Sequence, residues 1–465
     1  MAIEYVENLI IGSGVAGKLL AWTLASQGQK TVVVERAMVG GSCPNVACLP
    51  SKNVIHSAKA ISLVDPARGL GVVTGNVRVD MAAVARRKWK MVNELVDAHL
   101  AKFKASGAEL VMGEGRFTGA KTIEVVLNAG GMRQLKGNRV FINVGTRARI
   151  PNVPGLAEAK PMTHVEALNL ERLPEHLVIL GGGYVSLEFA QTIRRFGSRV
   201  TIIQRGSRLL EGEDTDVSDG LLDLMSDEGI DVLLEVEVLK VTGRSGENVT
   251  LLIRSGSGER TCEASDVLVA AGRTPNTDRL DLDRTGVEVD SRGYIRVNDR
   301  LETTVPDVWA TGESAGSPQF THVGEDDFRI VLDNLNGGRR TTRGRVIPYV
   351  LFTDPELAHI GLTETEARSQ GVRYRITKIP MSTVFRAQTL SETRGFVKAL
   401  IGDDDRILGF TAFGVEASEM MAVVQTAMLG RLPYTALRDA IFTHPTSAEG
   451  LIGLFLNAPA APAGA

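Results

Sequence analysis

The sequence predicts an α/β protein with two similar βαβ units and a separate C-terminal α+β domain. Two glycine-rich turns, at residues 12–17 and 181–186, each follow a short apolar strand and open a helical run. From about residue 346 the pattern changes to alternating apolar strands followed by helices. Because a domain usually takes ~100 to 200 residues, a chain of 465 residues is expected to form about three domains.

The first βαβ unit is predicted from an apolar strand at 6–11, a helix at 18–27 and a second strand at 31–34 that ends in Glu35. The turn between the first strand and the helix reads Gly-Ser-Gly-Val-Ala-Gly. This GxGxxG pattern, in this context, predicts a dinucleotide-binding unit of the Rossmann type.

Each residue of this pattern has a physical task. Gly12 permits the turn, Gly14 lets a pyrophosphate approach the backbone, and Gly17 allows the helix to pack closely on the strand. The first amides of the helix bind phosphate, and Glu35 is placed to accept hydrogen bonds from a ribose.

The second unit repeats the order, with a strand at 177–180, a helix through Phe196 and a strand at 199–203. Gly181 and Gly183 take the places of the first two glycines, and the small Ser186 replaces the third. Two dinucleotide sites are therefore predicted.

The end of the second strand in this unit predicts the nucleotide. It reads Gln204-Arg205-Gly206-Ser207-Arg208, with no carboxylate to hold a ribose diol. Because arginine pairs well with a 2′-phosphate, Arg205 and Arg208 favour NADPH over NADH, although NADH remains possible and two solvated arginines are the alternative.

Composition excludes several classes of function. Lys plus Arg (52) nearly balances Asp plus Glu (55), which argues against nucleic acid or an anionic membrane as a partner. No apolar run reaches the ~18 residues of a membrane span. Glu4 and Glu7 stand where a secretory signal would be basic, so we expect a cytoplasmic protein.

Two cysteines lie only five positions apart, in Gly41-Ser42-Cys43-Pro44-Asn45-Val46-Ala47-Cys48. This spacing indicates a reversible disulfide at the start of a helix, where the helix dipole favours a thiolate. Lys52 falls on the same helical face as Cys48. With only seven histidines and no second cysteine pair, no metal site is predicted, and Cys262 is expected to be a buried structural thiol.

The segment from Gly40 to Lys52 resembles the redox-active motif of the flavin-dependent pyridine nucleotide-disulfide oxidoreductases, which include dihydrolipoamide dehydrogenase, glutathione reductase and mercuric reductase. The resemblance implies FAD and NAD(P)H as cofactors. It makes Cys48 the thiolate beside the flavin and Cys43 the thiol that attacks substrate. Glu188 matches the acidic partner of Lys52, and Tyr184 matches the aromatic residue that covers the nicotinamide pocket.

The resemblance extends over nearly the whole chain and predicts two groups of cofactor residues. The FAD group is Gly12, Gly14, Gly17, Glu35, Gly41, Ser42, Gly145, Gly312 and Glu313. The NAD(P) group is Gly181, Gly183, Tyr184, Gln204, Arg205, Arg208 and Gly272. Glu313 departs from the aspartate usual in the family, which leaves its contact with the flavin open.

The same resemblance divides the chain into domains. Residues 1–148 and 273–340 are expected to form the FAD domain, 149–272 the NAD(P) domain and 341–456 the dimerisation domain. Residues 457–465, rich in Ala, Pro and Gly, are expected to be a disordered tail.

The segment Phe442-Thr443-His444-Pro445-Thr446-Ser447-Ala448-Glu449 supplies an acid–base pair. Exchange of a disulfide needs a base to deprotonate Cys43 and an acid to protonate the leaving thiolate, and His444 suits both tasks. Glu449 is expected to orient its ring. The resemblance implies that His444 reaches the cysteines of a second subunit, so we expect a homodimer with shared active sites.

The sequence ranks the substrates without naming one. Reduction of a small disulfide is favoured by Arg205, Arg208 and His444. A mercuric or other soft metal ion reductase is the second hypothesis, disfavoured by a C-terminal segment without cysteine. Dihydrolipoamide dehydrogenase is the third, disfavoured by Gln204. A flavin-containing binding protein without turnover fits poorly with the cysteine pair, and Arg386 either meets an acidic substrate or is solvated.

Overall fold

The N-terminal βαβ unit belongs to a six-stranded sheet in which β1 lies between β2 and β5, parallel to both. The computed structural model describes residues 2–64 and 69–460. The strands of this sheet are β1 (Ile3–Ile11), β2 (Thr31–Glu35), β3 (Glu109–Gly119), β4 (Thr122–Leu127), β5 (Met132–Ile142) and β15 (Val308–Ala310). The helices of this part are α1 (Val15–Ser26), α2 (Ser42–Asn45), α3 (Cys48–Leu63), α4 (Met81–Ser106), α8 (Thr321–Leu335) and the 3₁₀ turns η2 (Asn276–Arg279), η3 (Leu282–Arg284) and η4 (Gly312–Ala315).

Two predicted elements begin three residues earlier in the structure. The strand β1 begins at Ile3 rather than at residue 6, because its first residues pair with β5, starting with Ile3 opposite Gln134. Helix α1 begins at Val15 rather than Lys18, because the Lys18 amide already donates to the Gly14 carbonyl at 2.9 Å.

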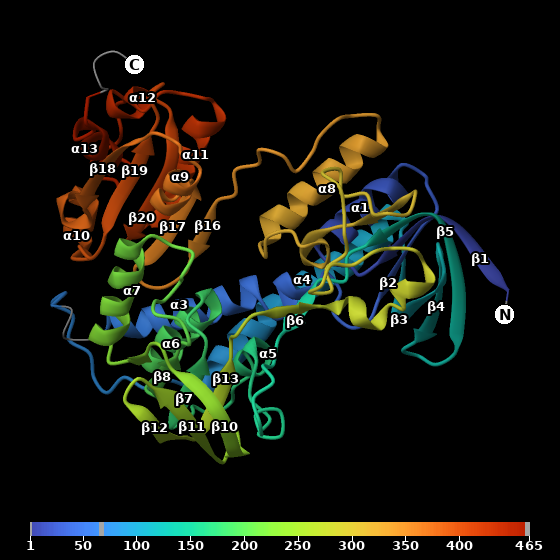
Figure 1. The fold of residues 1–465 in the computed structure, drawn as a ribbon, viewed down its shortest axis with the longest axis horizontal. Coiled ribbons are helices and arrows are strands. Elements are labelled where there is room, and N and C mark those ends of the chain that lie inside the picture. Colours follow the sequence, from blue (N-terminus) through green and yellow to red (C-terminus); the bar gives the residue numbers. More distant parts are fainter. Residues whose placement is uncertain (1, 65–68, 461–465) are drawn as a thin grey trace.

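The second βαβ unit forms a four-stranded parallel sheet in the order β13-β7-β8-β9. Its elements are β7 (His176–Leu180), β8 (Arg199–Ile203), β9 (Asp231–Leu233), β13 (Asp266–Val269), α5 (His164–Ala167), α6 (Tyr184–Phe196) and α7 (Thr215–Asp227). An antiparallel sheet of β10 (Glu237–Arg244), β11 (Asn248–Ser255) and β12 (Gly258–Ala264) lies beside it (Figure 1). Cys262 lies on β12 and is only partly buried rather than fully buried as expected.

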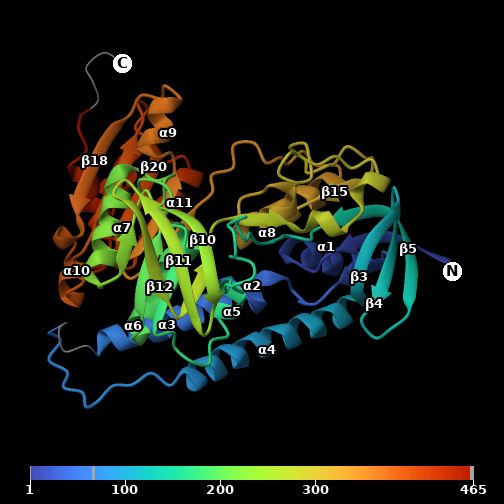
Figure 2. The same cartoon turned by 60° about the horizontal axis from the view of Figure 1, so that its bottom comes forward.

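A two-stranded ribbon joins the two units. The strands β6 (Thr146–Ala148) and β14 (Arg273–Pro275) pair antiparallel and carry the chain into and out of the second unit. This ribbon lies at the predicted boundaries of the NAD(P) domain. The long helix α4 extends along both units (Figure 2), and Lys88 on it donates to the Leu168 carbonyl at 2.8 Å.

The C-terminal domain is a five-stranded antiparallel sheet in the order β16-β17-β20-β19-β18. Its elements are β16 (Tyr349–Leu351), β17 (Glu356–Gly361), β18 (Arg375–Pro380), β19 (Phe396–Ile401), β20 (Ile407–Gly414), α9 (Glu364–Ser369), η5 (Met381–Thr383), α10 (Phe385–Leu390), α11 (Ala417–Leu429), α12 (Thr435–Arg438) and α13 (Gly450–Leu456). The last residues of the expected tail, 461–465, lie outside the described residues. Among the described residues, no helix has the length and apolar character that crossing a bilayer requires.

One hydrophobic core connects the parts that carry the predicted site. Val54 and Ala58 of α3 pack into the same cluster as Leu187 of α6 and Leu351 of β16. Helix α3, which begins at Cys48, is therefore fixed against both the second unit and the C-terminal domain.

Candidate active site

The cysteine loop is folded against the first glycine turn. Gly40 and Gly41 have left-handed backbones, with φ of 91° and 79°. A Cβ on Gly41 would stand 2.6 Å from the Cα of Gly14, so glycine is needed for this approach. Asn45 Nδ2 donates to the Val39 carbonyl at 3.1 Å and to the Gly41 carbonyl at 2.7 Å, which fixes the loop.

The two cysteines are free thiols with different chemistry. Cys48 is the first residue of α3, and its Sγ lies 3.2 Å from Thr321 Oγ1. A hydrogen bond from Cys43, aided by Thr321 and by the charge of Lys52, lowers the pKa of Cys48 to about 6 against the effect of burial. The hydrogen bond with Cys48, followed by burial, raises the pKa of Cys43. These opposite shifts in pKa favour the thiolate at Cys48 and the protonated thiol at Cys43.

The predicted Lys52–Glu188 pair is present. Lys52 Nζ donates to Glu188 Oε1 at 2.9 Å and to Oε2 at 2.7 Å. Glu188 also accepts the Phe352 amide at 3.0 Å, and the ammonium lies 4.9 Å from the centre of the Phe352 ring. These contacts fix the cation one helical turn from Cys48.

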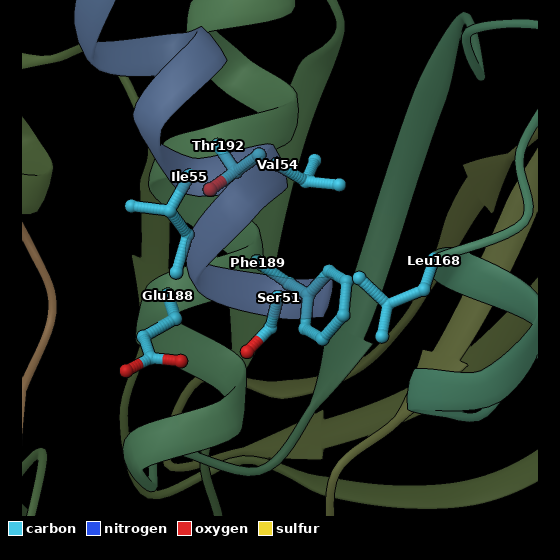
Figure 3. Close-up of a pocket in the computed structure, with 7 residues that line it drawn as sticks. All are labelled: Ser51, Val54, Ile55, Leu168, Glu188, Phe189 and Thr192. Carbon is cyan, nitrogen blue, oxygen red and sulfur yellow. The ribbon is translucent and has the colours of Figure 1, made fainter. Parts of the chain in front are cut away.

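A small cavity lies behind this pair, between α3 and α6 (Figure 3). Ser51 and Ile55 line it from α3, and Glu188 and Thr192 line it from α6. Its volume of about 10 Å³ is near the least that can hold one water molecule, and it is too small for a substrate.

The first glycine turn fits a bound dinucleotide. A Cβ on Gly12 would stand 2.3 Å from the Asn143 carbonyl oxygen, and one on Gly17 would stand 2.2 Å from the Gly12 carbonyl oxygen. A Cβ on Gly14 would stand 2.5 Å from Oδ1 of the Asn143 side chain. Side chains here would therefore destroy the close packing that exposes the first amides of α1 to a phosphate.

Glu35 lies at the end of β2, as predicted, and both of its carboxylate oxygens accept hydrogen bonds. Oε2 accepts the Ser13 amide at 2.9 Å and the Ser13 hydroxyl at 2.7 Å, while Oε1 accepts the amides of Ala37 and Met38. The carboxylate thus fixes the backbone of the glycine turn and of the residues that follow β2.

Glu313 points toward the ribbon between the two units. Thr146 Oγ1 donates to Glu313 Oε2, and Arg273 Nε donates to the same oxygen at 3.1 Å. Gly312 precedes it with φ of 64°, and its amide donates to the buried Asp327 at 2.7 Å. The glutamate side chain therefore bonds residues of both β6 and β14.

The second glycine turn also has the geometry of a dinucleotide site. A Cβ on Gly181 would stand 2.5 Å from the Ala270 carbonyl oxygen, whereas Gly183 faces open space at the start of α6. Ser186 Oγ donates to the Gly181 carbonyl at 2.5 Å, so this small residue bonds the turn as well as fitting it. Gly145 and Gly272, with φ of 63° and 103°, lie at the two ends of the β6–β14 crossing.

The residues after β8 form a polar group. Arg205 is exposed, while Arg208 Nη1 donates to Thr215 Oγ1 at 2.8 Å. Gln204 Nε2 lies 3.4 Å from Glu211 Oε1, so a carboxylate does stand near the end of this strand. The sequence pattern did not reveal Glu211 because it lies seven positions beyond Gln204 rather than at the strand end.

His444 and Glu449 form the predicted pair at the surface of the C-terminal domain. His444 Nδ1 lies 2.9 Å from Glu449 Oε2, and 63% of the His444 side chain is exposed. Within the described chain no hydrogen bond or ion pair joins His444 to the cysteine loop. Arg386, on the same domain, pairs loosely with Glu416 at 3.5 Å rather than being simply solvated.

Several contacts at the site came from residues that sequence patterns did not single out. Thr321 contacts Cys48 across 273 positions of sequence, and Glu213 accepts hydrogen bonds from both Tyr184 and Tyr349. A single threonine or glutamate carries no spacing signal of its own.

Comparison with known proteins agrees with this geometry. Residues 7–327 match the family model described as pyridine nucleotide-disulphide oxidoreductase, and residues 347–453 match the dimerisation domain of the same family. The chain is 34% identical over 456 residues to the probable pyridine nucleotide-disulfide oxidoreductase RclA of Escherichia coli (strain K12), covering 97% of this chain and 98% of that protein. It is 33% identical to the mercuric reductase of Streptomyces lividans, covering 95% of this chain and 94% of the relative.

A solved structure gives the same result. The Cu(II) complex of the HOCl-induced flavoprotein disulfide reductase RclA from Escherichia coli superposes with a TM-score of 0.89 at 33% identity, covering 97% of this chain and 99% of that chain.

These findings confirm the predicted family, fold class and enzyme class. The FAD and NAD(P)H cofactors follow from the family, and the C-terminal domain is its dimerisation domain. The chain therefore belongs to the pyridine nucleotide-disulphide oxidoreductases.

Proposed function

We propose that the chain reduces a small disulfide, using electrons that NAD(P)H delivers to the Cys43/Cys48 pair. The observation that carries this proposal is the position of the pair. Cys48 is the first residue of α3. The close approach of Gly41 to Gly14 keeps the cysteine loop packed against the first glycine turn. The two thiols thus lie beside the glycine turn that is proposed to bind the first dinucleotide.

FAD, when bound, supplies the two-electron chemistry that links the nicotinamide to the cysteine pair. Its pyrophosphate and ribose would be held by the turn of Gly12, Gly14 and Gly17 and by Glu35, which meet the steric demands described above. Gly41, Ser42, Gly145, Gly312 and Glu313 complete the proposed set. Lys52 supplies a fixed positive charge beside the Cys48 thiolate.

The unequal cysteines support distinct roles in substrate reduction. Deprotonated Cys43 attacks one sulfur of the substrate, forms a mixed disulfide and expels the first substrate thiolate, which takes a proton from His444. The Cys48 thiolate then attacks Cys43 and releases the second thiolate. The substrate disulfide gains two electrons, and the cysteine pair loses two as it closes to a disulfide.

His444 is proposed as the acid and base of this exchange. The raised pKa of Cys43 means that a base must deprotonate it before attack. Glu449 contacts His444 Nδ1, which leaves Nε2 for the proton transfer. Because nothing within the described chain joins His444 to the cysteine loop, the proposal places it in the active site of a partner subunit.

The nucleotide is proposed to be NADPH in preference to NADH. The exposed Arg205 is free to meet a 2′-phosphate, and Gly181, Gly183, Gly272 and Tyr184 would surround the rest of the molecule. Gln204 and Arg208 stand beside the same end of β8.

Reduction of a soft metal ion is the second candidate. Both thiols are partly accessible, and soft cations seek sulfur. Relatives described as mercuric reductases, and the RclA structure described as a Cu(II) complex, support including metal ions among the substrates tested.

The test is consumption of NADPH and NADH by the purified protein with oxidised glutathione, other small disulfides, lipoamide, and Hg(II) or Cu(II) in excess thiol. We expect saturable turnover of one small disulfide, with loss of that turnover in Cys43→Ser. Turnover with metal ions alone would establish the second candidate instead, and undiminished disulfide turnover in Cys43→Ser would contradict the proposal.

A further inference from the structure

A buried carboxylate connects the second unit to the C-terminal domain beside the proposed nicotinamide pocket. Glu213 is only 4% exposed. Its Oε1 accepts the Tyr184 hydroxyl at 3.1 Å and the Tyr349 hydroxyl at 2.7 Å. Its Oε2 is buried and has no hydrogen-bond partner among the described residues.

The two tyrosines belong to an aromatic cluster with Phe320. The Tyr184 ring meets Phe320 edge-on at 6.4 Å and Tyr349 edge-on at 5.9 Å, and Phe320 stacks on Tyr349. Phe320 directly precedes Thr321, the residue that contacts Cys48. The cluster therefore joins all three domains close to the redox-active pair.

The Glu213 carboxylate depends on the two tyrosine hydroxyls, because they are the hydrogen bonds that its side chain accepts among the described residues. Loss of a hydrogen-bond partner costs more for a buried charged acceptor than for a buried neutral one. Burial, followed by the charge of Glu213, raises the pKa of Tyr184 and of Tyr349, so both hydroxyls stay protonated and donate. If the Tyr184 ring moves, Glu213 keeps only Tyr349.

We propose that Glu213 and Tyr349 are positioning residues that hold Tyr184 in its resting place, so that an entering nicotinamide must break the Tyr184–Glu213 hydrogen bond. This inference rests on the proposed function, in which Tyr184 covers the nicotinamide pocket. The carboxylate lowers the affinity for the nucleotide and keeps the pocket closed when no nucleotide is bound. Tyr349 acts through Glu213, because its shorter hydrogen bond fixes the carboxylate.

The test is a double-mutant cycle of Tyr184→Phe and Glu213→Leu in the FAD-loaded protein, with binding of oxidised NADP⁺ and NAD⁺ measured by titration calorimetry. Each single variant removes the same hydrogen bond, so each is expected to bind the preferred nucleotide roughly three- to tenfold more tightly. The double variant is expected to match the single variants rather than multiply their effects. In turnover, Glu213→Leu is expected to lower KM for the nucleotide while kcat changes little.

Two conservative variants complete the design. Tyr349→Phe is expected to tighten binding less than Glu213→Leu, because Glu213 and Tyr184 remain. Tyr374→Phe is the matched control: its hydroxyl donates to Glu364 on the same domain, outside the cluster, and its loss is expected to leave nucleotide binding unchanged.

The outcomes separate this inference from the proposed function. If NAD(P)H fails to bleach the flavin of the wild-type protein without oxygen, the proposed function is wrong and the inference falls with it. If the wild-type flavin is reduced but Glu213→Leu leaves binding unchanged, or has its full effect in the Tyr184→Phe background, only the inference is wrong.

Discussion

Cys48 and Cys43 share a loop but differ in their surroundings. Cys48 has the helix N-terminus, the Thr321 hydroxyl and the Lys52 ammonium around it, whereas Cys43 is partly buried and donates to Cys48. The first is thus suited to remain a thiolate, and the second to act when a base approaches.

We predict that Cys48→Ser keeps its bound, reducible flavin and loses the long-wavelength absorbance that arises when a thiolate contacts flavin. The physical reason is that serine has no thiolate to donate charge. Cys43→Ser is the control and is expected to retain the band. An unchanged band in Cys48→Ser would contradict the assigned roles.

The pH dependence of that band follows from the lowered pKa of Cys48. The thiolate is present above its pKa of about 6 and is protonated as the pH falls through that value. We therefore expect the absorbance of Cys43→Ala, which has no hydrogen-bond donor at this position, to disappear at a higher pH than that of the reduced wild-type protein. Identical titrations would show that the Cys43 hydrogen bond does not stabilise the thiolate.

Arg205 carries the prediction for nucleotide choice. Because its guanidinium is exposed, Arg205→Ala is expected to lower kcat/KM for NADPH about tenfold and to leave that for NADH nearly unchanged. Arg172→Ala, on the same unit but paired with Asp266, is the control. A wild-type protein that uses NADH with the higher kcat/KM would overturn the preference.

At the scale of elements, a buried ion cluster joins α7 to the C-terminal sheet. Lys398 on β19 is 2% exposed, and its ammonium lies 2.9 Å from Asp214, 2.9 Å from Asp216 and 3.1 Å from Glu364. Burial opposes ionisation of Asp214 and Asp216, but hydrogen bonds from Lys398 and from other neighbours lower the pKa of both. This contribution to stability is present at neutral pH and is lost as the pH falls through those lowered values.

We expect Lys398→Met to reduce the free energy of unfolding by about 3 to 5 kcal/mol, because it takes the ammonium away from the buried Asp214 carboxylate. Lys378→Met is the matched control: Lys378 also pairs with Asp216, but its side chain is 39% exposed, so its loss is expected to cost less than about 1 kcal/mol. Denaturant unfolding of the FAD-loaded proteins measures both. Equal losses in the two variants would contradict the account.

The elements show how far sequence reasoning reaches. Motifs with fixed local spacing were predictable, since Lys52 follows Cys48 by one helical turn and Glu449 lies close after His444. The contacts of Thr321 and Glu213 depend on how three domains meet, which local spacing does not encode. Helix α4 was also missed, although Asp80 caps its start and Gly107 its end.

The same limit applies to the direction of a side chain. Sequence placed Glu313 after β15 but did not reveal that its carboxylate bonds Thr146 and Arg273, because these residues approach only when β6 pairs with β14.

At the scale of the whole molecule, the proposed sharing of active sites between two subunits can be tested directly. We predict that hybrid dimers of Cys43→Ser and His444→Ala chains, purified through two different tags, have about half of the wild-type disulfide turnover, because one of the two shared sites is intact. Each parent homodimer is expected to be nearly inactive. Hybrids no more active than the parents would place both residues of a site in one chain.

The most direct test of the central claim is an anaerobic titration of the purified protein with NADPH. If electrons pass through FAD to the Cys43/Cys48 disulfide, the wild-type protein takes up about two equivalents of NADPH per flavin, and Cys43→Ser takes up about one. Full reduction of the wild-type protein by a single equivalent would show that the cysteines do not receive the electrons.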